Sequence, residues 1–273
     1  MLARVLVIGA NGVVGRQVAV RLAAEGVDVH AAGRHGPVPV DLEDPRTLEA
    51  ALDGVDGVFL VWPLFDAAHA EAAVTAIAAH ARRVVYVSST TVRDDLERQL
   101  HPYSAFHAEI ERLLAASGAD WTVLRATWLA KNALGWRDEL HEGVVRFAYP
   151  DARRTPLDER DLAAVAVRAL LDDGHAGLRH VVTGPETVTE GEQVALLAEL
   201  LGLDVRHELI TPEEELADLL ALGLSHEVAA AGVAHRRLLV DEPEPVTTAV
   251  LDVTGAPART FRAWVRDNAA AFA

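Results

Sequence analysis

Three glycines near the N-terminus have the spacing of a phosphate-binding turn. The segment Gly9-Ala10-Asn11-Gly12-Val13-Val14-Gly15 directly follows an apolar, strand-like run and opens a helix-like one. In such a turn the first glycine permits the tight bend, the second lets the backbone approach a pyrophosphate, and the third allows close helix–strand contact. The start of the helix adds unpaired N–H groups and a partial positive charge. The expected dinucleotide contacts are Gly9, Asn11, Gly12, Val13, Val14 and Gly15; the alternative is a tight turn that packs without a ligand.

Arg34 indicates which dinucleotide is bound. It ends the second strand-like run, in Ala32-Gly33-Arg34-His35, where a protein that selects NAD tends to carry an acid for the ribose 2′-hydroxyl. An arginine suits the 2′-phosphate of NADP instead, because its planar guanidinium matches phosphate oxygens. The sequence therefore predicts NADP(H) in preference to NAD(H), with Asp41 and Leu42 beside the adenine. The alternative for Arg34 is an ordinary surface arginine.

These residues require a sheet that brings strand ends together. Short β-branched runs alternate with Ala-rich helical stretches through the first half of the chain, beginning with residues 2–8, 13–25 and 27–32. Such alternation is typical of β-α-β units around a parallel sheet covered on both faces. The sequence therefore predicts an α/β fold of the Rossmann type, with a doubly wound parallel sheet.

The alternation loosens after about residue 128. Residues 157–171 have the pattern of an amphipathic helix and 179–182 that of one more strand, whereas helices are expected at 190–201, 211–222 and 258–271. We expect residues 1–128 and 157–183 to form the dinucleotide-binding domain. Residues 129–156 and 184–273 are expected to form a smaller, mostly helical substrate-binding cap over the carboxyl edge of the sheet, where open α/β sheets bind ligands.

The composition excludes several classes of function. Residues are 51% hydrophobic and 24% charged, which suits a sizeable core, and the net charge of −16 opposes binding to nucleic acids or anionic membranes. The chain has no cysteine, and its twelve histidines lack metal-ligand spacing, so neither disulfides nor a metal site is expected. Without a long apolar run or a leader sequence, the protein is expected to be cytoplasmic. The acidic stretches 213–215 and 242–245 are interpreted as solvated surface.

Several motifs in order along the chain resemble a known family. The glycine turn and Gly33-Arg34 are followed by Val85-Tyr86-Val87-Ser88-Ser89, His107-x-x-x-Glu111, residues 117–125, Asn132, and residues 158–163 and 183–186. This order resembles atypical short-chain dehydrogenases/reductases of the NmrA-like group over nearly the whole chain. The resemblance implies a Rossmann fold, NADP(H), and a substrate cleft beside a small C-terminal domain. Family members include quinone, imine and isoflavone-type reductases and redox-sensing proteins, so the cofactor is implied more firmly than the reaction.

The catalytic Tyr-x-x-x-Lys of the wider dehydrogenases is absent. Lys131 is the sole lysine, and Thr127 stands four residues before it. The nearest substitute is Tyr103 with His107 one helical turn later, where His107 would bind the nicotinamide ribose and relay a proton. Such a relay would titrate between about pH 5.5 and 7.5. Ser89 matches the hydroxyl that polarises a substrate carbonyl in related enzymes; alternatively, Tyr103 is a packing aromatic and the hydroxyls of residues 88–91 line a turn.

The remaining site predictions come from position along the chain. Val61, Trp62 and Pro63 follow the strand whose end normally passes the cofactor's ribose, and the resemblance adds cofactor contacts at Ser88 and Thr127. The residues expected at the substrate are Trp62, Trp128, Lys131 and Asn132. Tryptophans would suit a flat, aromatic substrate, although Trp136 is equally well explained by packing.

Together these features predict an NADPH-dependent reductase of a small carbonyl, quinone or imine compound. The expected partner is a small molecule, with no nucleic acid or membrane, and a homodimer is left open. Two alternatives remain: a non-catalytic NADP(H)-sensing regulatory protein, and a redox-neutral epimerase or cyclase. The missing Tyr-x-x-x-Lys favours the sensor, whereas the predicted cap and tryptophan-lined cleft favour an enzyme.

Overall fold

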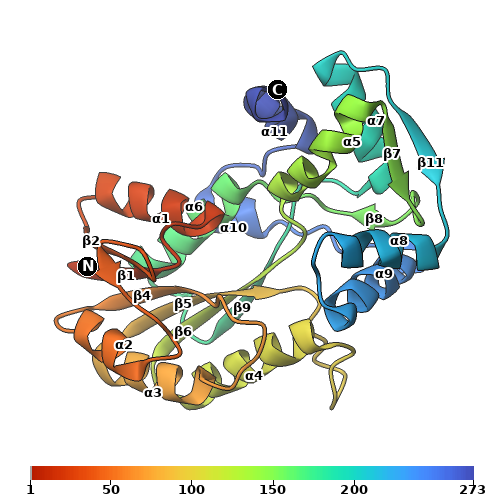
Figure 1. The fold of residues 1–273 in the computed structure, drawn as a ribbon. Helices are drawn as coiled ribbons and strands as arrows, with labels where there is room; N and C mark the ends of the chain where they lie inside the picture. The colour runs from red at the N-terminus through yellow and green to blue at the C-terminus, as the bar shows by residue number, and fades with distance from the viewer. Residues whose placement is uncertain (1) are drawn as a thin grey trace. The chain divides into compact units, whose positions relative to one another are not determined.

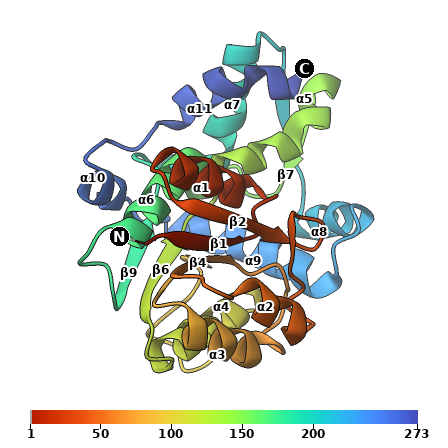
Figure 2. The same cartoon turned by 90° about the vertical axis from the view of Figure 1, so that its left-hand side faces the viewer.

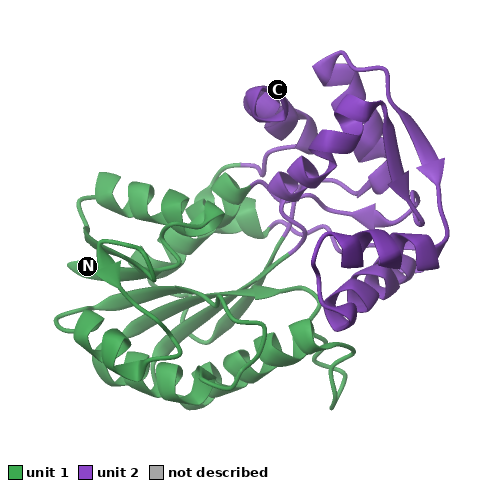
Figure 3. Cartoon of the chain, in the orientation of Figure 1, with its two compact units in different colours: residues 1–126, 159–182, 249–256 green, residues 127–158, 183–248, 257–273 purple. Residues whose placement is uncertain are grey.

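The computed structural model describes residues 2–273, which divide into two compact units (Figure 3). Unit 1 contains the chain through Ala126 together with Glu159–Val182 and Ala249–Ala256. Unit 2 contains Thr127–Asp158, Thr183–Thr248 and Pro257–Ala273. Each unit therefore assembles from segments that are far apart in the sequence.

A seven-stranded parallel sheet forms the centre of unit 1. Its strands are β1 (Arg4–Ile8), β2 (Asp28–Gly33), β3 (Val38–Pro39), β4 (Gly57–Val61), β5 (Arg83–Ser89), β6 (Asp120–Ala126) and β9 (Leu178–Val182). They lie in the order β3-β2-β1-β4-β5-β6-β9, and every neighbouring pair is parallel. Because the chain winds outward in both directions from β1 and β4, the predicted Rossmann-type doubly wound fold is confirmed.

Helices cover both faces of this sheet (Figures 1 and 2). One face carries α2 (Pro45–Ala51), α3 (Ala70–His80) and α4 (Pro102–Ala116), and the other carries α1 (Val13–Ala24), α6 (Glu159–Leu171) and α10 (Ala249–Thr254). With helices on both sides, the inner residues of β1 and β4 are apolar, and residues 5–7 and 58–60 have no exposed surface. Helix α10 packs on α6 within unit 1, although the sequence analysis places residues 184–273 in the cap.

Unit 2 is smaller and mostly helical. Its elements are η1 (Ala130–Trp136), α5 (Arg137–Glu142), β7 (Val144–Phe147), β8 (Arg153–Arg154), β10 (Val188–Thr189), α7 (Glu190–Leu201), β11 (Arg206–Leu209), α8 (Pro212–Ala221), α9 (His226–Asp241), α11 (Phe261–Asn268) and η2 (Ala269–Phe272). Two short sheets, β7–β11 and β8–β10, accompany the helices. An apolar cluster that includes Phe147, Phe261 and Trp264 forms its core. No helix within residues 2–273 has both the length and the apolar character needed to span a membrane.

Candidate functional site

A cavity of about 380 Å³ lies where the winding of the sheet reverses, beside the carboxyl ends of β1 and β4. Parallel sheets bind ligands at this point because the connections from adjacent strands leave in opposite directions. The lining residues all belong to unit 1: Ile8, Gly9, Asn11, Gly12, Gly33, Arg34, His35, Val40, Asp41, Leu42, Val61, Pro63 and Leu64. Its volume falls in the range of about 300–1,000 Å³ that is usual for small-molecule sites.

The glycine turn is held together by its own backbone. Gly9 adopts a positive φ of 87°, and its carbonyl accepts a hydrogen bond from the Gly12 N–H at 2.9 Å. A Cβ on Gly15 would lie 2.2 Å from the same carbonyl oxygen, so α1 and β1 approach this closely only with glycine there. Gly12 caps α1 without a side chain, and the first N–H groups of a helix have no acceptor within it. These donors suit the phosphates of a dinucleotide.

Arg34 and His35 occupy the middle of the next turn. The Gly36 N–H donates to the Gly33 carbonyl at 3.1 Å, which closes the turn between β2 and β3. Both side chains are exposed, and neither makes a hydrogen bond or ion pair with any of residues 2–273. Two basic side chains without a partner therefore line the cavity, which fits a negatively charged ligand group.

The predicted cofactor residues separate into two groups. Those that line the cavity are Gly9, Asn11, Gly12, Arg34, Asp41, Leu42, Val61 and Pro63. Val13, Val14 and Gly15 form the first turn of α1 and lie outside the lining. Ser88 and His107 lie further along the sheet, on β5 and α4, and Thr127 belongs to unit 2.

Trp62 does not supply an aromatic wall. It is 6% exposed, packs in the core beneath α2 and α3, and donates its indole N–H to the Asp66 carbonyl at 2.8 Å. The Trp62 ring therefore lies in the core, and its contact with substrate or cofactor stays a prediction. The exposed aromatic of this loop is Phe65, which is 70% exposed and which the sequence analysis did not single out.

Tyr103 and Ser89 lie together at the carboxyl end of β5. Ser89 Oγ accepts hydrogen bonds from the backbone N–H of Thr91 at 3.2 Å and from its hydroxyl at 3.0 Å, which leaves the Ser89 proton for the Tyr103 oxygen. Desolvation raises the pKa of Tyr103, and the Ser89 hydrogen bond acts in the opposite direction. Tyr103 is 43% exposed as a residue, and its raised pKa keeps the phenol protonated near neutral pH.

His107 is structurally different from the lysine it was expected to replace. Its side chain is buried, its ring packs against Tyr103 with centroids 4.7 Å apart, and its Nδ1 lies 2.6 Å from the Tyr86 hydroxyl. Burial lowers the pKa of His107 to about 3, so the imidazole is neutral throughout the range from pH 5.5 to 7.5. Because the surrounding core opposes the charged form, the structure does not favour titration of a His107 relay in that range.

A partly buried ion network links α4 with β5, β6 and β9, and the sequence analysis did not predict it. Glu111 on α4 accepts from the Ser88 hydroxyl at 2.6 Å, from Arg125 at 2.7 and 3.0 Å, and from Arg179 at 2.9 Å. Arg125 also holds Asp94 with two hydrogen bonds, at 2.6 and 2.7 Å. The sequence analysis singled out Glu111 only as part of the His107-x-x-x-Glu111 motif, without an ion-pair partner.

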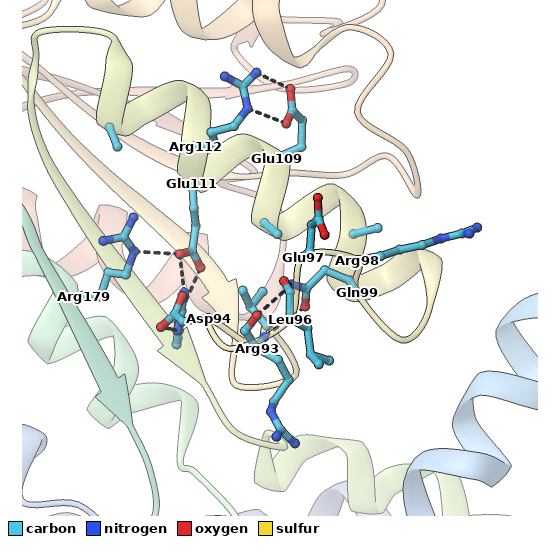
Figure 4. A pocket seen from close by; sticks show the side chains of 15 residues that line it. Arg93, Asp94, Leu96, Glu97, Arg98, Gln99, Glu109, Glu111, Arg112 and Arg179 are labelled. Carbon is cyan, nitrogen blue, oxygen red and sulfur yellow. Dashed lines mark hydrogen bonds and ion pairs between the residues drawn. The ribbon is translucent and has the colours of Figure 1, made fainter.

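Figure 4 shows Glu111, Asp94 and Arg179 of this network among the residues that line a second hollow, of about 550 Å³, beside α4 and the loop after β5. The lining arginines of this hollow mostly have carboxylate partners: Arg112 pairs with Glu109 at 2.6 Å and Arg125 with Glu111 and Asp94. The Ser88 hydroxyl donates its hydrogen bond to Glu111 and so holds the end of β5 against α4.

The other predicted substrate residues lie in unit 2. Trp128 and Trp136 pack with ring centroids 5.8 Å apart and planes tilted by 35° at the edge of the unit 2 core, and the Arg154 guanidinium lies 5.7 Å from the Trp128 ring. Lys131 is half-buried at the start of η1, and Asn132 beside it is exposed. Thr127 is buried and donates its hydroxyl to the Thr155 carbonyl at 2.8 Å.

Two acidic stretches interpreted as solvated surface contain buried carboxylates. Glu215 and Glu244 are 5% and 8% exposed. Glu215 pairs with Arg236, and Glu244 accepts from the Thr155 N–H at 2.8 Å and lies near Arg154. Desolvation raises the pKa of Glu244, while Arg154 acts against this shift. The solvated interpretation of these two residues is wrong, because arginines from distant segments fold over them. No cluster of three or more His, Asp or Glu side chains suited to a metal ion occurs within residues 2–273.

Comparison with known proteins agrees with this architecture. A family described as NAD(P)H-binding matches residues 9–173. The chain is 35% identical to a (4-alkanoyl-5-oxo-2,5-dihydrofuran-3-yl)methyl phosphate reductase of Streptomyces griseus and 32% identical to an NAD(P)H azoreductase of Xenophilus azovorans, over 98% of this chain and 99% of each relative. A nucleoside-diphosphate-sugar epimerase structure from Staphylococcus aureus has the same fold, with a TM-score of 0.82, 16% identity, and coverage of 96% of this chain and 99% of that one.

The order of the strands and the glycine turn between β1 and α1 define a Rossmann-fold protein. The family match and the two relatives then settle the membership: this chain belongs to the NAD(P)H-binding family. The resemblance to atypical short-chain dehydrogenases/reductases is thereby confirmed.

Proposed function

We propose that this protein is an NADPH-dependent reductase of a small carbonyl, quinone or imine compound. The observation that carries the proposal is the cavity beside β1 and β4, where a glycine turn and an unpartnered arginine line one space. The two relatives named above are both called reductases, one of a furanone phosphate and one of azo compounds. Their substrates differ, which supports the reaction type more strongly than any one substrate.

The residues of this cavity fit an NADP molecule. Gly12 and the first N–H groups of α1 would bind the pyrophosphate, Arg34 the 2′-phosphate, and Leu42 the adenine. Bound there, the nicotinamide would supply hydride transfer. Arg34 gives the preference for NADPH, since losing its charge-assisted hydrogen bonds costs about 1.5–3 kcal/mol, or about ten- to a hundredfold in affinity.

Tyr103 and Ser89 would orient the substrate and supply its proton. Tyr103 is protonated and partly exposed, and a hydrogen bond from Ser89 would orient its oxygen. The chain places no lysine four residues after this tyrosine, and His107 is neutral, so the phenol acts as a donor without a neighbouring cation on its own helix turn. A positioned donor of this kind typically contributes about 10²–10⁴-fold to the rate.

The neutral His107 also favours a second candidate, a protein that senses NADP(H) without turnover. One experiment separates the two: purified protein with NADPH and a panel of quinones, azo compounds, imines and ketones, followed by loss of reduced-nicotinamide absorbance. A reductase consumes NADPH in stoichiometric proportion to at least one acceptor. Tight NADPH binding without consumption on any acceptor in the panel would favour the sensor and contradict the reductase.

A further inference from the structure

Strand β11 is exposed along its whole length. All four of its residues, Arg206–Leu209, are exposed, which is true of no other strand within residues 2–273. It pairs with β7 alone, in a parallel two-stranded sheet of unit 2 (Figure 1). An unpaired strand edge presents a row of free N–H and C=O groups, which is a ready template for another strand.

The backbone hydrogen bonds show which groups of β11 are free. The Arg206 N–H donates to the carbonyl of Gly143, just before β7, at 3.1 Å, and the Ile210 N–H donates to β7 at 3.4 Å. Because alternate residues of a strand present their N–H groups to opposite edges, those of His207 and Leu209 face away from β7. Neither of these two N–H groups has a hydrogen-bond partner within residues 2–273.

The opposite edge of the same small sheet is closed by carboxylates. In β7, the N–H of Arg146 donates to the Glu139 side chain at 3.1 Å. The N–H of Ala148, just after β7, donates to the Glu215 side chain, also at 3.1 Å. Side chains that cover an edge in this way prevent its pairing with another strand. The contrast leaves β11 as the edge at which this sheet can extend.

The charges of β11 are complementary to those of a second copy of the same strand. Arg206 and Glu208 lie two residues apart, so their side chains share one face, and their charged groups are 3.4 Å apart. When two copies of β11 pair antiparallel about a two-fold axis at His207, Arg206 of each copy lies opposite Glu208 of the other. Opposite charges at such positions stabilise a sheet, whereas like charges destabilise it. The same register places Leu209, which is 68% exposed, opposite Val205 of the other copy.

We propose that β11 is a self-association surface, at which two copies of this chain join their two-stranded sheets into one four-stranded sheet. The free N–H and C=O groups of His207 pair with those of His207 in the second copy. A contact about a two-fold axis is closed, so its product is a dimer and not a filament. The inference concerns unit 2 alone and does not depend on the proposed function.

Sedimentation equilibrium of the full chain without nucleotide tests the inference, over about 1–500 µM protein because so short a strand gives a small, weak interface. Arg206→Glu places like charges opposite each other at both cross-strand positions and should raise the dimer dissociation constant about tenfold or more. Adding Glu208→Arg to this variant restores both pairs and should return the constant to within about threefold of wild type. Arg262→Glu, which breaks an exposed pair with Glu199 elsewhere in unit 2 and changes the net charge equally, should match wild type.

A further variant tests the backbone contact. Leu209→Pro removes an N–H that faces away from β7, so it leaves the β7 pairing intact and should abolish the dimer. Circular dichroism and urea unfolding of each variant check that the fold is kept. Wild type that stays monomeric at about 500 µM would overturn the inference, as would a dimer that both Leu209→Pro and Arg206→Glu leave unchanged. Loss of the dimer in Arg206→Glu without recovery in the double variant would overturn it as well.

Discussion

The two regions of unit 1 that we propose to bind the cofactor and to act on the substrate are built in different ways. The cofactor turn is made of backbone: Gly9, Gly12 and Gly15 bring β1 and α1 together, and a single carbonyl oxygen limits which residues fit. The region around Tyr103 is made of side chains, from Ser89 and Tyr86 on β5 and His107 on α4. A backbone-built site depends on local sequence, whereas a side-chain-built site depends on which distant residues meet.

The largest expected effect is a loss of stability where contacts between side chains of distant segments are removed. Arg125→Met leaves Glu111 buried without one of its two arginine partners, which should lower the free energy of unfolding by about 3–5 kcal/mol. Denaturant unfolding of both proteins measures the loss. Arg82→Met, which removes an exposed pair with Asp120, is the control and should cost under about 1 kcal/mol. Equal stability of Arg125→Met and wild type would mean that the network contributes little.

A slightly smaller loss of stability is expected when the backbone of the glycine turn is disturbed. Gly15→Ala places a Cβ 2.2 Å from the Gly9 oxygen and 2.7 Å from the Gly9 carbonyl carbon, so the turn must shift, at a cost of about 3 kcal/mol. Gly232→Ala in α9, where nothing lies within 4 Å of the added Cβ, should be neutral or gain up to about 1 kcal/mol. If thermal unfolding places the two variants at the same stability, α1 does not need glycine at this position.

The third prediction addresses the chemistry at Tyr103. Tyr103→Phe should lower kcat by about a hundredfold, because it removes the proton donor, while the dissociation constant of NADPH stays within about twofold. Steady-state kinetics on an acceptor found in the panel, with NADPH titration of the same preparations, measures both. A fully active Tyr103→Phe would make the tyrosine a packing residue and assign the proton to solvent.

The last prediction concerns His107 and the stability in acid. The pKa of His107 is about 3 in the folded protein and about 6.5 when unfolded, so the unfolded chain binds one more proton between those values. Stability is therefore complete above about pH 6.5 and falls, on this account alone, by up to about 1.4 kcal/mol per pH unit below it. His107→Gln should remove that part of the slope in urea unfolding measured from pH 7 to 4. His101, His175 and His180, whose pKa values are also lowered by burial, remain in both proteins. An unchanged slope would show that His107 is charged in the folded state.

The same contrast explains what could be predicted from the sequence. The parallel sheet and the cavity-lining residues of the glycine turn follow from local spacing, so the fold was predicted together with a set of residues that do line one cavity. The burial of Trp62, His107 and Glu244 depends on segments far apart in the chain, so local spacing could not indicate it. Helix α9 was missed because only Ala229, Val233 and Leu239 of its sixteen residues are buried, which leaves little periodicity to detect.

The central claim is that the glycine turn and Arg34 form one binding site for NADPH. Calorimetric titration of NADPH into wild type and Gly12→Val tests it most directly, because Gly12 is exposed at the start of α1 and a side chain there occupies the space that a pyrophosphate needs. The account predicts saturable binding of NADPH to wild type at one site, and loss of binding by Gly12→Val with unchanged far-UV circular dichroism. Binding of NADPH to Gly12→Val with the affinity of wild type would place the nucleotide elsewhere and contradict the account.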